Sequence, residues 1–324
     1  MKRLRQLTYL LIVFGVACTV TLAGEKEPHG WRSGFVNSSD GVKIHYVEAG
    51  RLSIPASVQP SLGGAPGISV GASASHQGHE ALTILFVPGW TMSEWIWDEQ
   101  IEFFSKGYHV IAMDPRSQGE STQTGAGLFP AARASDIKVV IDQLHLAPVV
   151  LVGWSMAVTE VAAYVDQFGT KGIAGFVLVD GAVGGFSPGD AESDFSMLKG
   201  VLEDRSNQTD AFVRKLCFHK PHPEDYVKRV IDESLKVPTT TAVALLVGYM
   251  AADYRAALSK FDKPTLIIAA KSGYADYVVA IQKQIPDSKI EVFDGVGHAL
   301  FVDDPDHFNS VLLDFIRGPA PAAH

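Results

Sequence analysis

The chain has 324 residues, of which 47% are hydrophobic and 19% are charged. This composition supports a large buried core and argues against a chain that is disordered throughout. The formal net charge of −9 argues against a nucleic-acid partner, and two cysteines are too few for a disulfide scaffold or a four-cysteine zinc site.

Residues 1–23 have the pattern of a secretory signal peptide. Three cationic side chains in MKRLR precede an apolar run, and the small residues of TLA end at Ala23. This order predicts cleavage after Ala23, export to a periplasmic or secreted location, and no stable membrane insertion afterwards. The alternative is a membrane anchor formed by residues 7–23, because the apolar run is close to the length that spans a bilayer.

The next segment predicts a hairpin followed by an insertion. Residues 34–50 read as two strands with Asp40-Gly41 at the turn. Residues 51–80 are rich in Ser, Gly, Ala and Pro, which is typical of a loop or flexible insertion. We assign no chemistry to this insertion.

Short, unbroken apolar runs then alternate with helix-like stretches. The apolar runs are 82–87, 109–113, 148–153, 175–180, 264–270 and 289–293. The helix-like stretches are 94–106, 130–145, 156–168, 276–284 and 304–316. Unbroken apolar runs fit strands that are covered on both faces, so the alternation predicts an α/β fold with a doubly wound, mostly parallel sheet.

The alternation stops between residues 181 and 262. This stretch reads as consecutive helices, with AFVRKLCF, EDYVKRVIDESLK and TTAVALLVGYMAADYRAAL as the clearest pieces. We therefore predict a helical cap at 181–262 over a core formed by residues 24–180 and 263–324. The sequence gives no indication of the oligomeric state.

The strongest chemical signal is the segment VVLVGWSMAVTEVAAYV. An apolar strand leads into Gly153-Trp154-Ser155-Met156-Ala157, and a helix follows at once. A sharp strand–turn–helix junction exposes a serine oxygen at its apex, and the helix N-terminus favours developing negative charge there. This context predicts that Ser155 is a nucleophile, whereas an isolated serine here would only cap the helix.

At this point the chain resembles the α/β-hydrolase superfamily over nearly all of the sequence after the signal segment. The segment LFVPGWTMSEWIWDEQIEFFSKGYHVIAMDPRSQGES is similar to that family's third to fourth strands, and GVGHALFVDDPDHFNSVLLDFI is similar to the segment that bears its histidine. The resemblance is greatest to capped serine esterases and cofactor-free haloperoxidases. Three positions depart from the family pattern: Pro88 replaces a frequent histidine, and Ser117 and Ala157 replace glycines. The resemblance implies that the backbone N–H groups of Trp90 and Met156 form the oxyanion hole.

The base and the acid are expected on loops beyond strand ends. His298 follows the run 289–293 and a Gly-Val-Gly turn, which places it where ligands bind parallel sheets. An imidazole can accept the serine proton near neutral pH. By resemblance the acid follows the run 264–270, which favours Asp276, with Asp180 as the alternative because some family members carry the acid after that earlier strand.

The predicted function is a serine hydrolase that cleaves a carboxylic ester or related small-molecule acyl substrate through an acyl-enzyme. Alternatives are a C–C bond hydrolase or an acyltransferase on the same triad, or a non-catalytic binding protein on this fold. A serine nucleophile excludes the dehalogenases and epoxide hydrolases of the superfamily, which need a carboxylate. No cofactor is expected, since phosphate-binding glycine motifs are missing. No metal is expected either, since His219 and His222 lack an accompanying ligand cluster.

Overall fold

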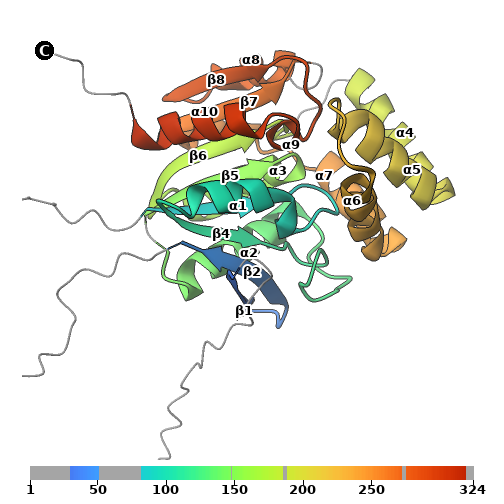
Figure 1. Ribbon diagram of the computed structural model, residues 1–324, viewed down its shortest axis with the longest axis horizontal. Coiled ribbons are helices and arrows are strands. Elements are labelled where there is room, and N and C mark those ends of the chain that lie inside the picture. Colours follow the sequence, from blue (N-terminus) through green and yellow to red (C-terminus); the bar gives the residue numbers. More distant parts are fainter. Residues whose placement is uncertain (1–29, 51–81, 147, 185–187, 272–274, 319–324) are drawn as a thin grey trace, which may run out of the picture.

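A computed structural model describes residues 30–50, 82–146, 148–184, 188–271 and 275–318 (Figure 1). The expected signal peptide at 1–23 and the expected insertion at 51–80 lie outside the described residues. Among the helices that the structure describes, none is long and apolar enough to cross a membrane.

The core is an eight-stranded sheet with the order β1-β2-β4-β3-β5-β6-β7-β8. Its strands are β1 (Arg32–Asn37), β2 (Lys43–Ala49), β3 (Thr83–Val87), β4 (His109–Met113), β5 (Val149–Trp154), β6 (Ile173–Val179), β7 (Thr265–Ala270) and β8 (Ser288–Phe293). The pairs β1–β2 and β2–β4 are antiparallel, and every other pair is parallel. The predicted hairpin and the predicted doubly wound, mostly parallel sheet are therefore confirmed.

Helices cover both faces of this sheet. Successive strand residues point to opposite sides, so an unbroken apolar strand presents an apolar surface on each face. In β3, Ile84 and Phe86 belong to one hydrophobic cluster, while Leu85 and Val87 belong to the other. The first cluster includes residues of η1 (Glu94–Trp97), α1 (Asp98–Phe104), α9 (Leu300–Asp303) and α10 (Pro305–Arg317). The second includes residues of α2 (Pro130–Gln143), α3 (Met156–Phe168) and α8 (Ala275–Gln282). Unbroken apolar strands are thus explained by burial on both sides.

A group of helices is inserted between β6 and β7 and gathers on the right of Figure 1. Its members are α4 (Pro188–Glu203), α5 (Arg205–Ala211), the π-helix η2 (Phe212–Cys217), α6 (Glu224–Lys236), α7 (Thr239–Met250) and the 3₁₀ helix η3 (Arg255–Lys260). α6 shows why such a segment folds onto its neighbours. Its buried residues, Val227, Val230, Ile231 and Ser234, fall on one face at helical spacing. We call this group the inserted helices.

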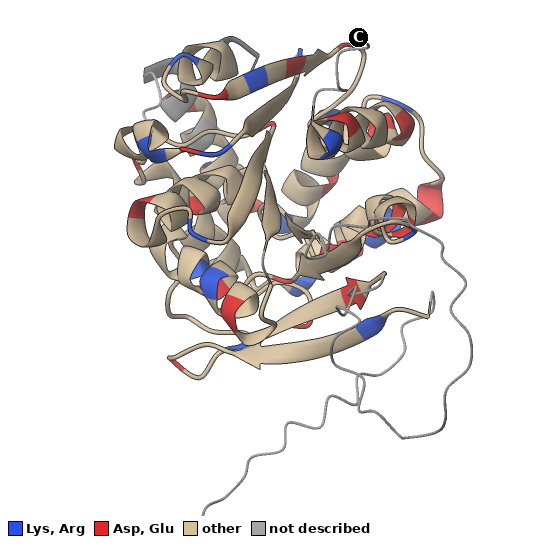
Figure 2. Ribbon diagram, turned by 90° about the vertical axis from the view of Figure 1, so that its left-hand side faces the viewer, with Lys and Arg blue, Asp and Glu red and all other residues tan. Residues whose placement is uncertain are grey.

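Charged side chains of both signs are spread over the helices and loops, whereas most of the sheet is uncharged (Figure 2). This distribution agrees with the strand burial, because a central strand covered on both faces has no place for an unpaired charge.

Candidate active site

Ser155 occupies a strained turn between β5 and α3. Its backbone has φ 60° and ψ −121°, a left-handed conformation that L-residues rarely adopt. The turn is tight because strand and helix touch: a Cβ on Gly153 would lie 2.8 Å from Val161 Cγ2 and 2.9 Å from the Ala157 carbonyl oxygen. The sequence pattern around Ser155 therefore produces the expected sharp strand–turn–helix junction, with Ala157 fully buried in it.

The imidazole of His298 lies between a hydroxyl and a carboxylate. Its Nε2 is 2.8 Å from Ser155 Oγ, and its Nδ1 is 2.6 Å from Asp180 Oδ2. Asp180 Oδ1 accepts a 2.9 Å hydrogen bond from the Ala270 N–H, which fixes the carboxylate on its other side. With the proton on Nδ1 donated to Asp180, Nε2 can accept the Ser155 proton. The three side chains can therefore act as an acid–base–nucleophile chain.

The contact with Asp180 reverses the order in which the sequence ranked the two acids. Asp276 is the second residue of α8, and its side chain lies outside the part of the chain that the structure describes. Asp180 follows β6 directly, and β6 pairs with β5, the strand that carries Ser155. Since β5 and β6 are parallel neighbours, a carboxylate directly after β6 lies at the same end of the sheet as Ser155. The structure therefore brings Asp180, the alternative acid, to His298, and we favour Asp180 over Asp276.

The loop that carries His298 is held by η2. The His298 N–H donates to the Leu216 carbonyl at 2.8 Å, and the Ala299 N–H donates to the Cys217 carbonyl at 2.9 Å. Approach is so close that a Cβ on Gly297 would lie 2.5 Å from the Cys217 oxygen. The inserted helices thus supply backbone acceptors to the histidine loop.

Asp303 is a second support of this loop that sequence reasoning missed. Its buried carboxylate accepts from the Gly297 N–H at 2.7 Å and from the His219 N–H at 2.8 Å, and it lies 2.7 Å from His222 Nε2. Of the two histidines considered as metal ligands, His222 therefore contacts Asp303 through its imidazole, and His219 contacts it only through its backbone N–H. The available signal was the position of Asp303 five residues after His298.

The loop of the expected oxyanion donor lies against Ser155. A Cβ on Gly89 would be 2.8 Å from Ser155 Cβ and 3.3 Å from Ser155 Oγ, so only glycine allows this approach. Trp90 follows this glycine, and Met156 follows Ser155 as the first residue of α3. Gly89 and Ser155 are therefore in contact, and each is followed directly by one of the two residues expected to donate a backbone N–H to the oxyanion.

Gln118 braces this loop from the core side and was also missed at the sequence level. Its Nε2 donates to the carbonyls of Gly89 at 2.9 Å and Met92 at 2.6 Å, and its Oε1 accepts from the Thr91 N–H at 3.2 Å. Its place near the end of the segment that resembles the family's third to fourth strands was the only sequence signal. Ser117, which stands where the family has glycine, indeed takes a left-handed φ of 65°.

Behind Gln118 lies a buried ion pair. Arg133 Nη2 donates to Gln118 Oε1 at 3.1 Å, and Arg133 Nε donates to Glu160, with both side chains of the ion pair 1% exposed. Burial raises the pKa of Glu160 despite the attraction of Arg133. The oxyanion loop is thus connected through Gln118 to charged groups deep in the core.

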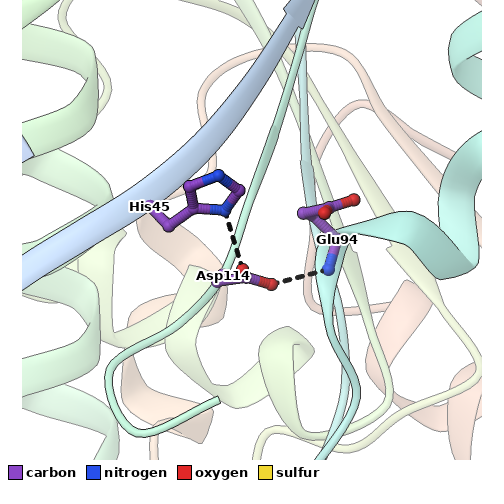
Figure 3. A group of neighbouring side chains, drawn as sticks. All are labelled: His45, Glu94 and Asp114. Atoms are coloured by element: carbon purple, nitrogen blue, oxygen red, sulfur yellow. Dashed lines mark hydrogen bonds and ion pairs between the residues drawn. The ribbon is translucent and has the colours of Figure 1, made fainter. Parts of the chain in front are cut away.

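One further group of side chains has a composition that metals can bind. Potential ligand atoms of His45, Glu94 and Asp114 all lie within 4.8 Å of one another (Figure 3). Asp114, however, already accepts from the N–H groups of Glu94 at 2.8 Å and Glu120 at 2.9 Å, and lies 2.8 Å from His45 Nδ1. Protein donors therefore occupy both carboxylate oxygens, and we interpret the trio as a brace for the loop after β4.

Known proteins resemble this chain in both sequence and fold. The family model for the alpha/beta hydrolase fold matches residues 83–305. A non-heme haloperoxidase from Rhodococcus erythropolis is 31% identical over 257 residues, covering 72% of this chain and 92% of that protein. A bifunctional esterase/perhydrolase from Acinetobacter calcoaceticus is 25% identical over 307 residues, covering 88% of this chain and 99% of that protein.

Solved structures agree with the architecture. An esterase from Exiguobacterium antarcticum superimposes with a TM-score of 0.74 at 22% identity, covering 88% of this chain and 99% of that one. At this identity the match demonstrates the fold alone. Together with the family model and the haloperoxidase relative, it shows that the chain belongs to the α/β-hydrolase fold family.

Proposed function

We propose that the protein is a serine hydrolase that cleaves a carboxylic ester or a related acyl substrate through an acyl-enzyme. One observation carries the proposal: His298 lies within hydrogen-bond distance of both Ser155 Oγ and Asp180 Oδ2. The Acinetobacter relative named as an esterase/perhydrolase supports acyl chemistry.

In the first half of the reaction, Ser155 Oγ attacks the acyl carbonyl carbon while His298 Nε2 takes the hydroxyl proton. Asp180 stabilises the imidazolium that results. The carbonyl oxygen becomes an oxyanion, and the N–H groups of Trp90 and Met156 are the proposed donors to it. One such donor contributes about 10²–10³ in kcat. The alcohol then leaves with the proton from His298, and the acyl group stays on Ser155.

In the second half, His298 takes a proton from water as its oxygen attacks the acyl-enzyme. Collapse of the second tetrahedral intermediate releases the carboxylic acid and returns the proton to Ser155 Oγ. Every step transfers protons or the acyl group, so these side chains and backbone N–H groups are sufficient for the proposed chemistry.

A second candidate is perhydrolysis, which the name of the Acinetobacter relative favours. Hydrogen peroxide would replace water in the second half, and attack on the acyl-enzyme would release a peracid and free Ser155. The acylation step is unchanged. Assays of the same ester with and without peroxide separate the two activities.

The decisive experiment is covalent labelling with a fluorophosphonate, which reacts with an activated serine. We expect labelling of the wild type, loss of labelling in Ser155→Ala, and full labelling in Ser206→Ala, a control at an exposed position of α5. Ser155→Ala should also retain less than about a thousandth of the wild-type kcat on a short-chain aryl ester. A folded wild type that resists labelling and cleaves no ester would instead support a non-catalytic binding protein.

A further inference from the structure

The side chain of Trp90 is held by the inserted helices. Its indole Nε1 donates to the Ala242 carbonyl of α7 at 2.9 Å. The guanidinium carbon of Arg205, on α5, lies 4.7 Å from the centroid of the Trp90 ring, and Phe212 of η2 meets the ring edge-on at 5.6 Å. Three inserted helices therefore contact the residue whose backbone N–H is the proposed oxyanion donor.

A chain of hydrogen bonds also joins Arg205 to the Trp90 carbonyl. Arg205 Nη2 donates to Ser234 Oγ at 3.3 Å and to the Ser234 carbonyl at 3.1 Å. Ser234 Oγ lies 2.7 Å from Thr91 Oγ1, and Thr91 Oγ1 donates to the Trp90 carbonyl at 2.8 Å. Since the threonine hydroxyl has one proton, which it gives to Trp90, the Ser234 hydroxyl must be the donor in the middle bond. The chain thus runs in one direction, from a cation to the carbonyl.

The surroundings strengthen this chain. Thr91 is 1% exposed and Ser234 is fully buried, so water does not compete for their hydroxyls. No carboxylate among the described residues forms an ion pair with Arg205. Burial lowers the pKa of Arg205 to about 10, which leaves it charged at neutral pH. A charged donor at one end makes the hydrogen bonds of the chain stronger than neutral ones.

The backbone of the loop needs such support. Thr91 has a φ of 57°, in the left-handed region, where a β-branched residue is strained. The Trp90 carbonyl belongs to the peptide after Trp90, and the proposed oxyanion donor belongs to the peptide before it. The two peptide planes meet at the Trp90 Cα, so a hydrogen bond that holds the Trp90 carbonyl restricts the rotations about φ and ψ through which the N–H could turn away.

We infer that Arg205, Ser234 and Thr91 are positioning residues through which the inserted helices set the direction of the Trp90 N–H toward the oxyanion. This inference rests on the proposed function. The three residues touch no reacting atom; they act through the Trp90 peptide. Because an oxyanion exists only in the transition state and the tetrahedral intermediates, their loss affects the chemical step rather than substrate binding.

The test compares Thr91→Val, which removes the hydroxyl but keeps the shape, with Thr91→Ser, which keeps the hydroxyl. On an aryl ester, Thr91→Val should lower kcat about tenfold or more while KM stays within about twofold, and Thr91→Ser should remain close to wild type. Ser234→Ala should show the same split. The double variant should lose no more than the more affected single variant, because both substitutions interrupt one chain.

A second readout separates positioning from stability. Phenylboronic acid forms a tetrahedral adduct with an activated serine, so its Ki should rise in Thr91→Val by about the factor that kcat falls. The matched control is Thr265→Val, at a buried threonine that donates to the Lys263 carbonyl at the start of β7. This control should lower Tm with kcat and Ki unchanged.

Unchanged kcat and Ki in Thr91→Val and Ser234→Ala, in an enzyme whose wild type is labelled and active, would overturn the inference and leave the proposed function intact. Equal losses in Thr91→Ser and Thr91→Val would also overturn it. If Thr91→Val fails to fold, Ser234→Ala decides the question. A wild type without labelling or esterase activity would remove the proposed function, and the inference with it.

Discussion

His298 Nδ1 lies 2.6 Å from Asp180 Oδ2, although the two residues are 118 positions apart in the sequence. The contact joins the loop after β8 to the end of β6, and Ser155 joins the same imidazole from the end of β5. β7 lies between β6 and β8 in the sheet, and its Ala270 N–H fixes the second carboxylate oxygen. The geometry of the site therefore depends on four neighbouring strands being in register.

Replacing Asp180 by Asn should reduce kcat by about 10³–10⁴, because asparagine cannot stabilise an imidazolium and can select the wrong imidazole tautomer. Asp276→Asn is the matched control and should stay within about tenfold of wild type. Thermal melting must show that both variants are folded, since Asp180 also accepts the Ala270 N–H. A large loss in Asp276→Asn with an active Asp180→Asn would restore the acid that the sequence favoured.

Ser155→Gly should be more stable than Ser155→Ala by about 1 kcal/mol, although glycine normally destabilises a folded chain. The reason is the φ of 60° at this position, which strains any residue with a Cβ. Both variants lack the hydroxyl and should be inactive. Urea denaturation of the two proteins measures the difference, and an alanine variant as stable as the glycine variant would show that the turn stores no strain.

Arg133→Met should lower the free energy of unfolding by about 3–5 kcal/mol, because it leaves Glu160 buried without its partner. The double variant Arg133→Met/Glu160→Met should regain much of this loss, since no buried charge remains. Urea denaturation of the wild type, both single variants and the double variant gives the coupling energy. Strictly additive losses would show that the two side chains do not stabilise each other.

Glu48 should make stability depend on pH. A hydrogen bond with His109, and then the charge of Arg32, hold the pKa of Glu48 below its ordinary value of 4.5. A lowered carboxyl pKa in the folded state stabilises the protein fully above about pH 4.5, and this contribution is lost as the pH falls through the folded-state pKa. The difference in unfolding free energy between wild type and Glu48→Gln should therefore be largest near pH 7 and shrink in acid. Glu102→Gln, at an exposed position of α1, is the control and should show little difference at any pH.

Local patterns predicted most of the sheet and its helices. The apolar run 109–113 coincides with β4, and the helix-like stretch 156–168 coincides with α3. The helix-like stretch 304–316 matches α10, which begins at Pro305, and the short helix α9 before Asp304 was not predicted. Asp304 itself has φ −141° and ψ 67°, because a residue before proline avoids the helical conformation.

The site was predictable only where its signal is local. Ser155 follows from a strand–turn–helix pattern within a few residues, and His298 from its place after a strand. The choice of acid depends on which strand end faces His298, and this is a property of the strand order rather than of the sequence near either aspartate. The structure also explains the glycine that follows Asp180: a Cβ on Gly181 would lie 2.3 Å from the Ser155 carbonyl oxygen, so the chain after Asp180 passes directly beside the nucleophile.

The backbone pairing between η2 and the histidine loop has a consequence for protein engineering. The carbonyls of Leu216 and Cys217 accept hydrogen bonds from the N–H groups of His298 and Ala299, and both carbonyls belong to the inserted helices. Exchanging all the inserted helices for those of a relative, in order to change substrate specificity, would remove these two hydrogen bonds from the turn that bears His298. Chimeras that retain residues 212–219 and replace only α4, α6 and α7 should therefore preserve the histidine's position better than complete swaps.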